Sequence, residues 1–210
     1  MFNIFNKRDK DTQDIKTEAG VDLKHNEKTF ELCEPIIKVL CDEGIDFIIF
    51  GGFAIFLQMI KFNNEQEAIF NFEKRTRVTD DIDIISKSIR EVMIMLESKP
   101  ETRILLEKRN LTEVKNSPYL INEAGTEIAL EDKRGIDILS CIQGYRIEDM
   151  EYDIVEYKGY ILKIATIETL MDMKTKLIET YGDGARDKDK SDAGLIKLMF
   201  EKKNEGGLKW

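Results

Sequence analysis

The chain has 210 residues, 42% of them hydrophobic and 35% charged, which is ordinary for a globular protein and long enough for one substantial core. The formal net charge of −9 argues against broad electrostatic attraction to nucleic acid or to anionic membranes. Three cysteines without a CxxC spacing predict reduced thiols in a cytoplasmic protein, and the single histidine, His25, nearly excludes Ser-His-Asp catalysis and histidine-rich zinc sites.

The first part of the chain predicts an arm followed by a helix. Residues 1–25 are polar and charged without a sustained apolar period, which indicates a flexible N-terminal arm. The charges in Met1–Lys10 do not fit a signal peptide, and no apolar run reaches membrane-spanning length, so we expect neither export nor insertion into a membrane. Residues 26–42 have apolar side chains at helical spacing, with Asn26 as a candidate cap and Pro35 as a candidate kink.

A buried strand leading into a glycine pair is predicted next. Phe47–Phe50 is a short, continuous apolar run, and Gly51 and Gly52 join it to Ala54–Leu57, which indicates a helix. Glycines at such a turn let the backbone approach a ligand closely, and the free N–H groups of a helix N-terminus suit a phosphate. A tight strand-to-helix turn without any ligand is the alternative.

An acidic strand follows a long polar connection over residues 61–76, which is either irregular or partly helical and could cover a site. In the stretch Arg77–Ile85, Asp81 and Asp83 face one side of the predicted strand and the intervening isoleucines face the other. Two carboxylates roughly 7 Å apart along a strand repel each other unless a cation lies beside them, and Mg²⁺ prefers oxygen ligands. The alternative is a strand end whose acids simply meet solvent.

A third acid repeats this pattern later in the chain. Asp137 is flanked by isoleucine on both sides in the predicted strand Ile136–Leu139. If that strand pairs beside the Asp81 strand, three carboxylates meet, as a site for two divalent ions about 4 Å apart requires. A single acid at a buried strand is the alternative, although a protein rarely tolerates one without a partner.

The remaining segments complete an α/β (α+β) fold with a mixed β-sheet flanked by helices and a C-terminal helical portion. Periodicity, turn and cap signals predict helices over 89–96, 167–181 and 187–200, a strand over 127–130 and a hairpin of strands 152–157 and 160–165. Residues 101–126 give no single assignment and are ambiguous between a short helix and irregular structure. We expect a core over 26–165, C-terminal helices over 166–203 packed on that core, and a tail over 204–210.

The order of these motifs resembles the DNA polymerase β-like nucleotidyltransferase superfamily. The resemblance rests on the apolar strand, Gly51-Gly52, the helix, Arg77-x-Thr79-x-Asp81-Ile82-Asp83 and Ile136-Asp137-Ile138. The Arg-x-Thr lead-in points to the small bacterial nucleotidyltransferases of the AbiE toxin type, and the similarity covers about residues 27–200. It implies a nucleotidyltransferase fold.

The resemblance also implies an activity and a set of site residues. A nucleoside monophosphate would move from a nucleoside triphosphate such as ATP to an acceptor hydroxyl, with release of pyrophosphate and with Mg²⁺, or Mn²⁺, as cofactor. Gly51 and Gly52 would approach the nucleotide phosphates. Asp81 and Asp83 would bind both ions, and Asp137 would complete the ion that activates the acceptor.

Two lysines near the C-terminus extend the implied site. Lys174 and Lys188 would contact the triphosphate, with Asp189 in the same wall, while ordinary solvated helix charges are the alternative for all three. Arg77 and Thr79 would orient the acidic strand rather than react. The sequence departs from the pattern at Phe53, where other branches often have a small polar residue, and in the long 61–76 connection.

The acceptor stays open among a small molecule, a tRNA and a protein, and a toxin of this type would have an antitoxin as partner. A second hypothesis is a catalytically inactive nucleotidyltransferase fold kept as a binding or interaction module. Asp-x-Asp also marks phosphatases of the haloacid dehalogenase type and metal-dependent glycosyltransferases. A phosphatase of the haloacid dehalogenase type would have Thr or Val two residues after the second acid, where this chain has Ile85. A glycosyltransferase gives no reason for the glycine pair.

Overall fold

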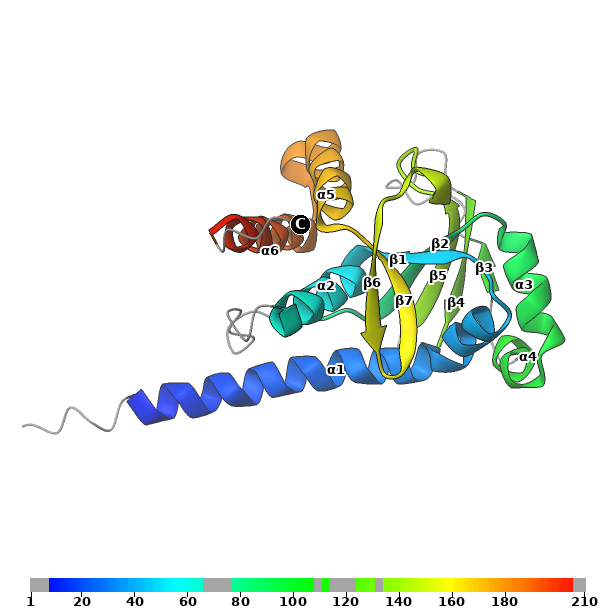
Figure 1. Cartoon of the computed structure of the whole chain (residues 1–210), viewed down its shortest axis with the longest axis horizontal. Helices are drawn as coiled ribbons and strands as arrows, with labels where there is room; N and C mark the ends of the chain where they lie inside the picture. Colours follow the sequence, from blue (N-terminus) through cyan, green and yellow to red (C-terminus); the bar gives the residue numbers. More distant parts are fainter. Residues whose placement is uncertain (1–7, 66–76, 108–110, 114–123, 131–133, 206–210) are drawn as a thin grey trace, which may run out of the picture.

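The structure is a computed structural model in which helices flank a seven-stranded mixed sheet (Figure 1). It describes residues 8–65, 77–107, 111–113, 124–130 and 134–205. The predicted fold class, a mixed sheet with flanking helices and a C-terminal helical portion, is confirmed. Residues 1–7 of the expected arm, 66–76 of the expected connection and 206–210 of the expected tail lie outside the described residues.

The helices and strands follow one another along the chain without strict alternation. In order they are α1 (Arg8–Asp42), β1 (Phe47–Phe50), α2 (Gly51–Glu65), β2 (Asp81–Ser86), α3 (Ile89–Ser98), α4 (Pro100–Glu107), β3 (Leu111–Glu113), β4 (Ala124–Ala129), β5 (Gly135–Cys141), β6 (Tyr152–Tyr157), β7 (Tyr160–Ala165), α5 (Ile167–Tyr181) and α6 (Asp187–Glu205). Short 3₁₀ turns precede β6 and α6.

The sheet order is β3-β4-β5-β2-β1-β7-β6. Strand β2 is antiparallel to β1 and parallel to β5, and β4 is antiparallel to β5 on the outer side. Strands β1, β2 and β5 therefore lie at the centre of the sheet, which places the predicted glycine turn and both predicted acidic strands next to one another.

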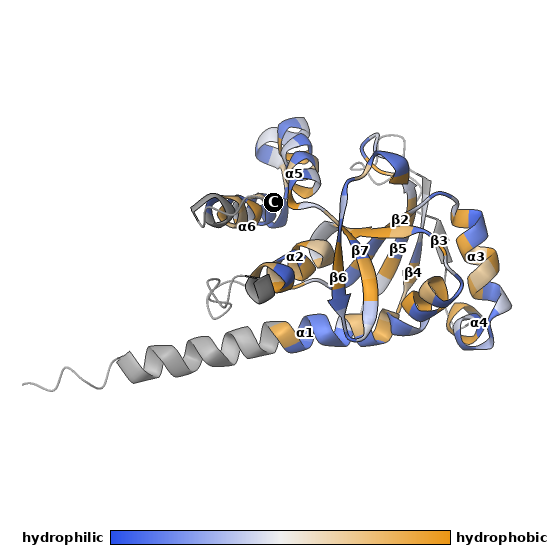
Figure 2. Cartoon of the chain, in the orientation of Figure 1, coloured by the Kyte–Doolittle hydropathy of each residue, from blue (hydrophilic) through white to orange (hydrophobic). Residues whose placement is uncertain are grey.

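The core explains why these segments form strands. All four residues of β1 are buried, because the strand runs through the centre of the sheet. In β2 and β5 the isoleucines beside the acids are fully buried on the face away from the carboxylates. Figure 2 shows hydrophobic colour along β1 and much of β7, whereas the edge strand β6 is mostly hydrophilic.

The helices form two groups around the sheet (Figure 1). Helix α1 contacts β2, β5, α3 and α4, whereas α2, α5 and α6 contact one another. Among the helices of the described residues, none has both the length and the apolar character that a membrane crossing requires.

Helix α1 differs from the sequence-based prediction, because it begins at Arg8 and Asn26 lies inside it rather than at its start. The buried Asn26 instead holds the segment that leads into β2: its Nδ2 donates to the Arg77 carbonyl at 2.5 Å, and its Oδ1 accepts from the Thr79 backbone N–H at 3.0 Å. Thr29, one turn later, donates to the Thr79 carbonyl at 2.9 Å. Asn26, which the sequence suggested as a helix cap, therefore makes tertiary hydrogen bonds to the segment before β2 instead.

Several other boundaries differ. Helix α2 begins at Gly51 and continues to Glu65, so the first residues of the expected 61–76 connection are helical. Strand β4 starts at Ala124, α4 fills part of the unassigned 101–126 segment, and α6 runs on to Glu205. The hairpin of β6 and β7 and helix α5 match the prediction, with Thr166 Oγ1 accepting from the Thr169 N–H at 3.2 Å.

Candidate active site

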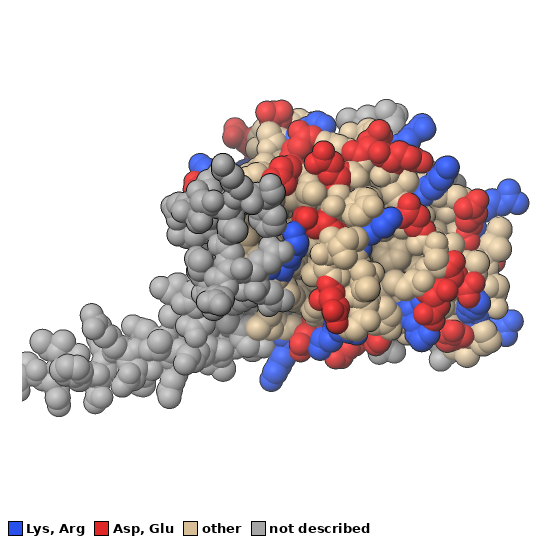
Figure 3. Space-filling view, in the orientation of Figure 1, with Lys and Arg blue, Asp and Glu red and all other residues tan. Residues whose placement is uncertain are grey.

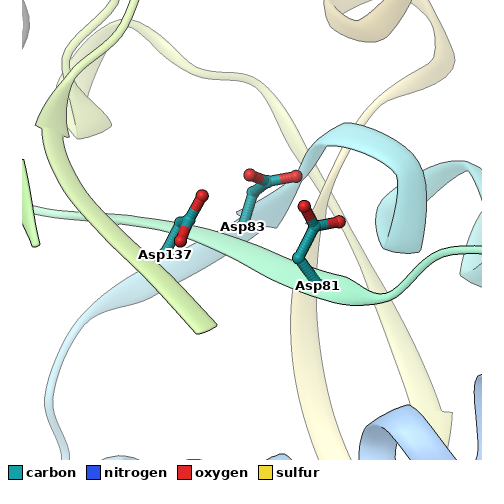
Figure 4. Close-up of side chains that lie close together, drawn as sticks. All are labelled: Asp81, Asp83 and Asp137. Carbon is teal, nitrogen blue, oxygen red and sulfur yellow. The ribbon is translucent and has the colours of Figure 1, made fainter. Parts of the chain in front are cut away.

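Asp81, Asp83 and Asp137 come together on one face of the sheet. Strands β2 and β5 are parallel and in a register that places Asp83 opposite Asp137 and Asp81 opposite Gly135. One carboxylate oxygen from each aspartate lies within 4.8 Å of the other two, and all three side chains are partly buried. Figure 4 shows them pointing to the same side of the two strands. The predicted convergence is thus present in the structure.

Burial and mutual repulsion change the acidity of this cluster. Burial, followed by the charges of Asp81 and Asp137, raises the pKa of Asp83 well above its ordinary value. Burial, followed by the charges of Asp81 and Glu127, raises the pKa of Asp137 to about 7. The charge of Asp81 acts to raise the pKa of both Asp83 and Asp137, and a divalent cation among the three carboxylates would remove this repulsion and accept oxygen ligands. The donor set therefore fits Mg²⁺ or Mn²⁺.

A threonine fixes the orientation of the first aspartate. Thr79 is buried, and its Oγ1 donates to Asp81 Oδ1 at 2.8 Å and lies 3.0 Å from the Asp81 carbonyl oxygen. The backbone of Thr79 is itself held by hydrogen bonds to Asn26 and Thr29 of α1. The lead-in segment thus positions Asp81, in agreement with the orienting role that the resemblance implied.

The glycine pair packs directly against the acids. Gly51 has a φ of +66°, and an added Cβ there would lie 2.0 Å from Asp83 Oδ2. A Cβ at Gly52 would lie 2.9 Å from Arg77 Nη2 and 3.2 Å from Thr79 Oγ1. Only glycine fits at Gly51, because the turn needs both a left-handed backbone and room for the carboxylate. The sequence indicated close approach to a phosphate; the structure adds close approach to Asp83.

These residues line a pocket of about 290 Å³. Four acids line it, Asp81, Asp83, Glu127 and Asp137, together with four basic residues, Arg77, Lys174, Arg186 and Lys188. The glycine turn, Gly51 and Gly52, is also part of the wall. The remaining lining residues are mostly apolar: Phe50, Leu139, Ile142, Gln143, Leu170, Met173 and Leu177. The pocket therefore brings together an acidic side on the strands and a basic side drawn mainly from α5 and the start of α6.

The predicted Lys174 is part of a buried ion network. Its Nζ lies 2.7 Å from Asp189 Oδ1 and 2.8 Å from Asp192 Oδ2. Asp192 is fully buried and also lies 2.5 Å from Arg77 Nε, while Asp189 accepts from Arg186 Nε at 2.6 Å. Burial acts to raise the pKa of Asp189, but the hydrogen bonds from Arg186 and Lys174 outweigh it and the pKa is lowered. Lys174 lines the pocket while paired with two carboxylates.

Lys188 has a different environment from Lys174. It is exposed near the start of α6 and lines the pocket. Its positive charge acts to lower the pKa of both Asp83 and Asp137, so it is close enough to interact with the charges of the acid cluster. Asp189, which the resemblance placed in the same wall, instead binds Lys174 and Arg186.

The sequence-based prediction missed Glu127 and gave Arg77 only an orienting role. Glu127 on β4 is opposite Asp137 on β5, so a row of carboxylates crosses three strands. The predicted strand contained Glu127, but nothing in the sequence showed which strand would be its neighbour. Arg77 preceded the acids in the motif, and only the fold shows that its guanidinium lies beneath Gly52 and lines the pocket.

Comparisons with known proteins find similarity at the level of structure. No family model and no curated protein matches the sequence. The solution structure of the antibiotic-resistance factor ANT(2'')-Ia is 15% identical, with 86% of this chain and 95% of that chain covered and a TM-score of 0.49. A nucleotidyltransferase-like protein from Paracoccidioides brasiliensis is 15% identical over 82% of this chain and 75% of that chain, with a TM-score of 0.44. The Megavirus polyadenylate synthase is 14% identical over 95% of this chain and 39% of that chain, with a TM-score of 0.49.

Proposed function

We propose that this chain is a metal-dependent nucleotidyltransferase, which moves a nucleoside monophosphate from a nucleoside triphosphate to an acceptor hydroxyl and releases pyrophosphate. The main support is the row formed by Gly51, which directly follows β1, Asp83 on β2 and Asp137 on β5, with Asp81 beside it. A phosphate-binding turn and a divalent-cation site then lie next to each other. The function is argued from these residues, because the similarity to solved structures concerns the fold.

Asp81, Asp83 and Asp137 would hold Mg²⁺ or Mn²⁺. When bound, such ions neutralise charge on the phosphates and increase the acidity of a nearby hydroxyl. The chain's own contribution is to fix the three carboxylates before ligands arrive: Thr79 orients Asp81, and the parallel register places Asp83 beside Asp137. Preorganised charge of this kind is a large part of catalysis in phosphoryl and nucleotidyl transfer.

The triphosphate would lie over the start of α2. The free N–H groups and the positive end of the helix dipole at Gly51 and Gly52 suit an anion. Arg77, Lys174, Arg186 and Lys188 add four positive charges to the pocket wall, and the buried Asp189 and Asp192 balance two of them. The positive charge that remains is available to the phosphates.

The sheet order suggests where the acceptor enters. In-line transfer places the attacking hydroxyl opposite the leaving pyrophosphate. With the pyrophosphate at the Gly51 end of the row, the acceptor would approach beside Asp137 and Glu127. A bond forms between the hydroxyl oxygen and the α-phosphorus as the bond from that phosphorus to the β-phosphate bridge oxygen breaks. The hydroxyl proton passes to Asp137 or to solvent.

The finer parts of the hypothesis rest on the sequence resemblance. The AbiE toxin type, an antitoxin partner and a cytoplasmic location stay predictions. The three cysteines, all in the described part of the chain, are not joined by disulfides. On the face in Figure 3, acidic and basic side chains are interspersed, with acidic ones prominent along the upper edge and at the lower right.

The experiment compares labels at two positions of the nucleotide. The full-length protein is incubated with Mg²⁺, cell extract and each triphosphate carrying ³²P at the α- or the γ-phosphate. Nucleotidyl transfer predicts that an acceptor becomes labelled only from the α-position, and that the Asp83→Asn variant does not label it. Label from the γ-position would indicate a kinase instead. Mg²⁺-dependent nucleotide binding without any labelled product would support the inactive binding module.

A further inference from the structure

The turn after β5 forms a rigid corner of the pocket. Ile142 and Tyr145 exchange both backbone hydrogen bonds, at 3.0 and 2.7 Å, around Gln143 and Gly144. These two central residues have φ values of +51° and +84°, as in a tight turn of type I′. The turn between β6 and β7 has the same φ values at Lys158 and Gly159, so this backbone conformation is not specific to the pocket.

Side chains fasten the Gln143 turn to α5. The Tyr145 hydroxyl donates to Asp172, and Lys176 Nζ donates to the Tyr145 oxygen at 3.1 Å and lies 4.4 Å from the ring centroid. Lys176 also pairs with Asp172 Oδ2 at 2.7 Å. The Tyr145 side chain thus joins the turn to Asp172 and Lys176 of α5, and Gln143, two residues before Tyr145, lines the pocket wall.

The pocket wall around Gln143 is apolar. Leu139 lies two residues beyond Asp137 on the same face of β5, and Ile142 follows at the end of that strand. Leu170, Met173 and Leu177 recur at the helical spacing of one α5 face and also line the pocket. Gln143 is the only uncharged polar side chain among the pocket-lining residues that the structure describes.

We propose that this part of the pocket is a nucleobase subsite, in which the Gln143 amide hydrogen-bonds the edge of the base and sets the preference among triphosphates. The inference rests on the proposed function. A base has apolar faces, which suit contact with Leu139, Ile142 and the leucines of α5, and an edge of adjacent donors and acceptors. A primary amide has one acceptor oxygen and two N–H donors, and since the Gln143 Oε1 is buried, its N–H groups would meet an acceptor on the base.

The phosphates and the base would then use separate parts of the pocket. Charged groups and the Gly51-Gly52 turn would bind the triphosphate, which is the same in every nucleotide. Gln143 would contact only the part that differs. Inorganic tripolyphosphate is therefore a probe that should bind without using Gln143.

The test measures the affinity of the full-length protein for four α,β-methylene nucleoside triphosphates and for tripolyphosphate, in Mg²⁺. Gln143→Gly suits the positive φ and keeps the turn, so the melting temperature should not fall. This variant should bind the preferred nucleotide about 3- to 10-fold more weakly, as loss of one or two neutral hydrogen bonds implies. Its affinity for tripolyphosphate should equal that of the wild type. Gln143→Glu, which removes the donors, should change the order of preference among the four bases.

Lys158→Gly is the matched control, because it makes the same change in a turn with the same φ values outside the pocket lining. It should leave all five affinities unchanged. The inference is overturned if Gln143→Gly binds every nucleotide with wild-type affinity, or if the wild type shows no difference among the bases. In either case nucleotide binding would still support the proposed function. Failure of the wild type to bind any triphosphate would instead reject both.

Discussion

Asp83 and Asp137 lie directly opposite each other on the parallel strands β2 and β5, although 53 residues separate them in the chain. Burial, followed by the charge of Asp81, raises the pKa of both carboxyls, to about 7 for Asp137. A pair of this kind is unfavourable when ionised and alone. Under the proposed function, this pair is the part of the structure that a bound cation would stabilise most directly.

The first prediction concerns pH and metal. Because the pKa of Asp137 is about 7 in the folded protein against an ordinary 3.8, the folded state binds this proton more tightly than the unfolded state does. Without metal, this group's contribution to stability should be greatest below about pH 4 and should be lost as the pH rises to 7. Melting temperatures from pH 5 to 8.5, with and without Mg²⁺, test this expectation.

Mg²⁺ should reverse the trend above pH 7, since it requires the ionised carboxylates. At a hundredfold excess over Kd, it should stabilise the protein by about 2.7 kcal/mol, which corresponds to roughly 5–10 °C for a chain of this size. Asp137→Asn should reduce both the pH trend and the response to Mg²⁺. An equal response to Mg²⁺ in the variant would contradict the assignment of Asp137 to the metal site.

The second prediction concerns Gly51 and uses Gly44 as its control. Both glycines have φ near +66°, but a Cβ at Gly44 meets nothing within 4 Å, whereas one at Gly51 would meet Asp83 Oδ2 at 2.0 Å. Gly44→Ala should lower stability by about 1–2 kcal/mol through backbone strain alone. Gly51→Ala should lower it further and should abolish Mg²⁺-dependent nucleotide binding. Equal losses for the two variants in chemical denaturation would mean that the Asp83 contact is unimportant.

The third prediction concerns Asp192, which balances Arg77 and Lys174 inside the protein. Asp192→Ala leaves two cations near a fully buried position without this partner, and it should lower the free energy of unfolding by about 3–5 kcal/mol. The exposed Glu179 on α5 offers a control, since Glu179→Gln should change stability by less than about 0.5 kcal/mol. Urea unfolding at pH 7 measures both. A small effect of Asp192→Ala would show that the network is dispensable.

The fourth prediction concerns Glu127. Its charge contributes to the raised pKa of Asp137, after burial and Asp81. Glu127→Gln should therefore move the midpoint of the pH dependence of Mn²⁺ binding to lower pH. Glu156→Gln, which neutralises an exposed acid on the distant edge strand β6, should leave the midpoint in place. An unchanged midpoint in Glu127→Gln would place Glu127 outside the electrostatic reach of the site.

Local patterns predicted the parts of the site that depend on strand periodicity. Isoleucines on both sides of Asp83 and Asp137 require burial on one face, so the carboxylates had to share the other face once β2 and β5 paired. The glycine turn followed from an apolar strand that ends at Phe50. The α5 helix followed from its apolar spacing and its Thr166 cap.

Tertiary pairing decided the features that the sequence did not reveal. Lys174 pairs with the buried Asp189 and Asp192, and this pairing depends on how α5 packs against α6. The role of Asn26 depends on α1 passing beside the lead-in to β2, which local cap preferences do not indicate. Gln143 lies in a turn whose place beside α5 is likewise set by packing.

The central claim is that three aspartates form a divalent-cation site shared with a nucleotide. Titration of Mn²⁺ by electron paramagnetic resonance, with a nonhydrolysable triphosphate present, tests it most directly. The wild type is predicted to bind Mn²⁺ and nucleotide together. Asp83→Asn is predicted to bind Mn²⁺ at least about tenfold more weakly, the effect of losing roughly 1.4 kcal/mol, without a lower melting temperature. Wild-type Mn²⁺ affinity in Asp83→Asn would contradict the account.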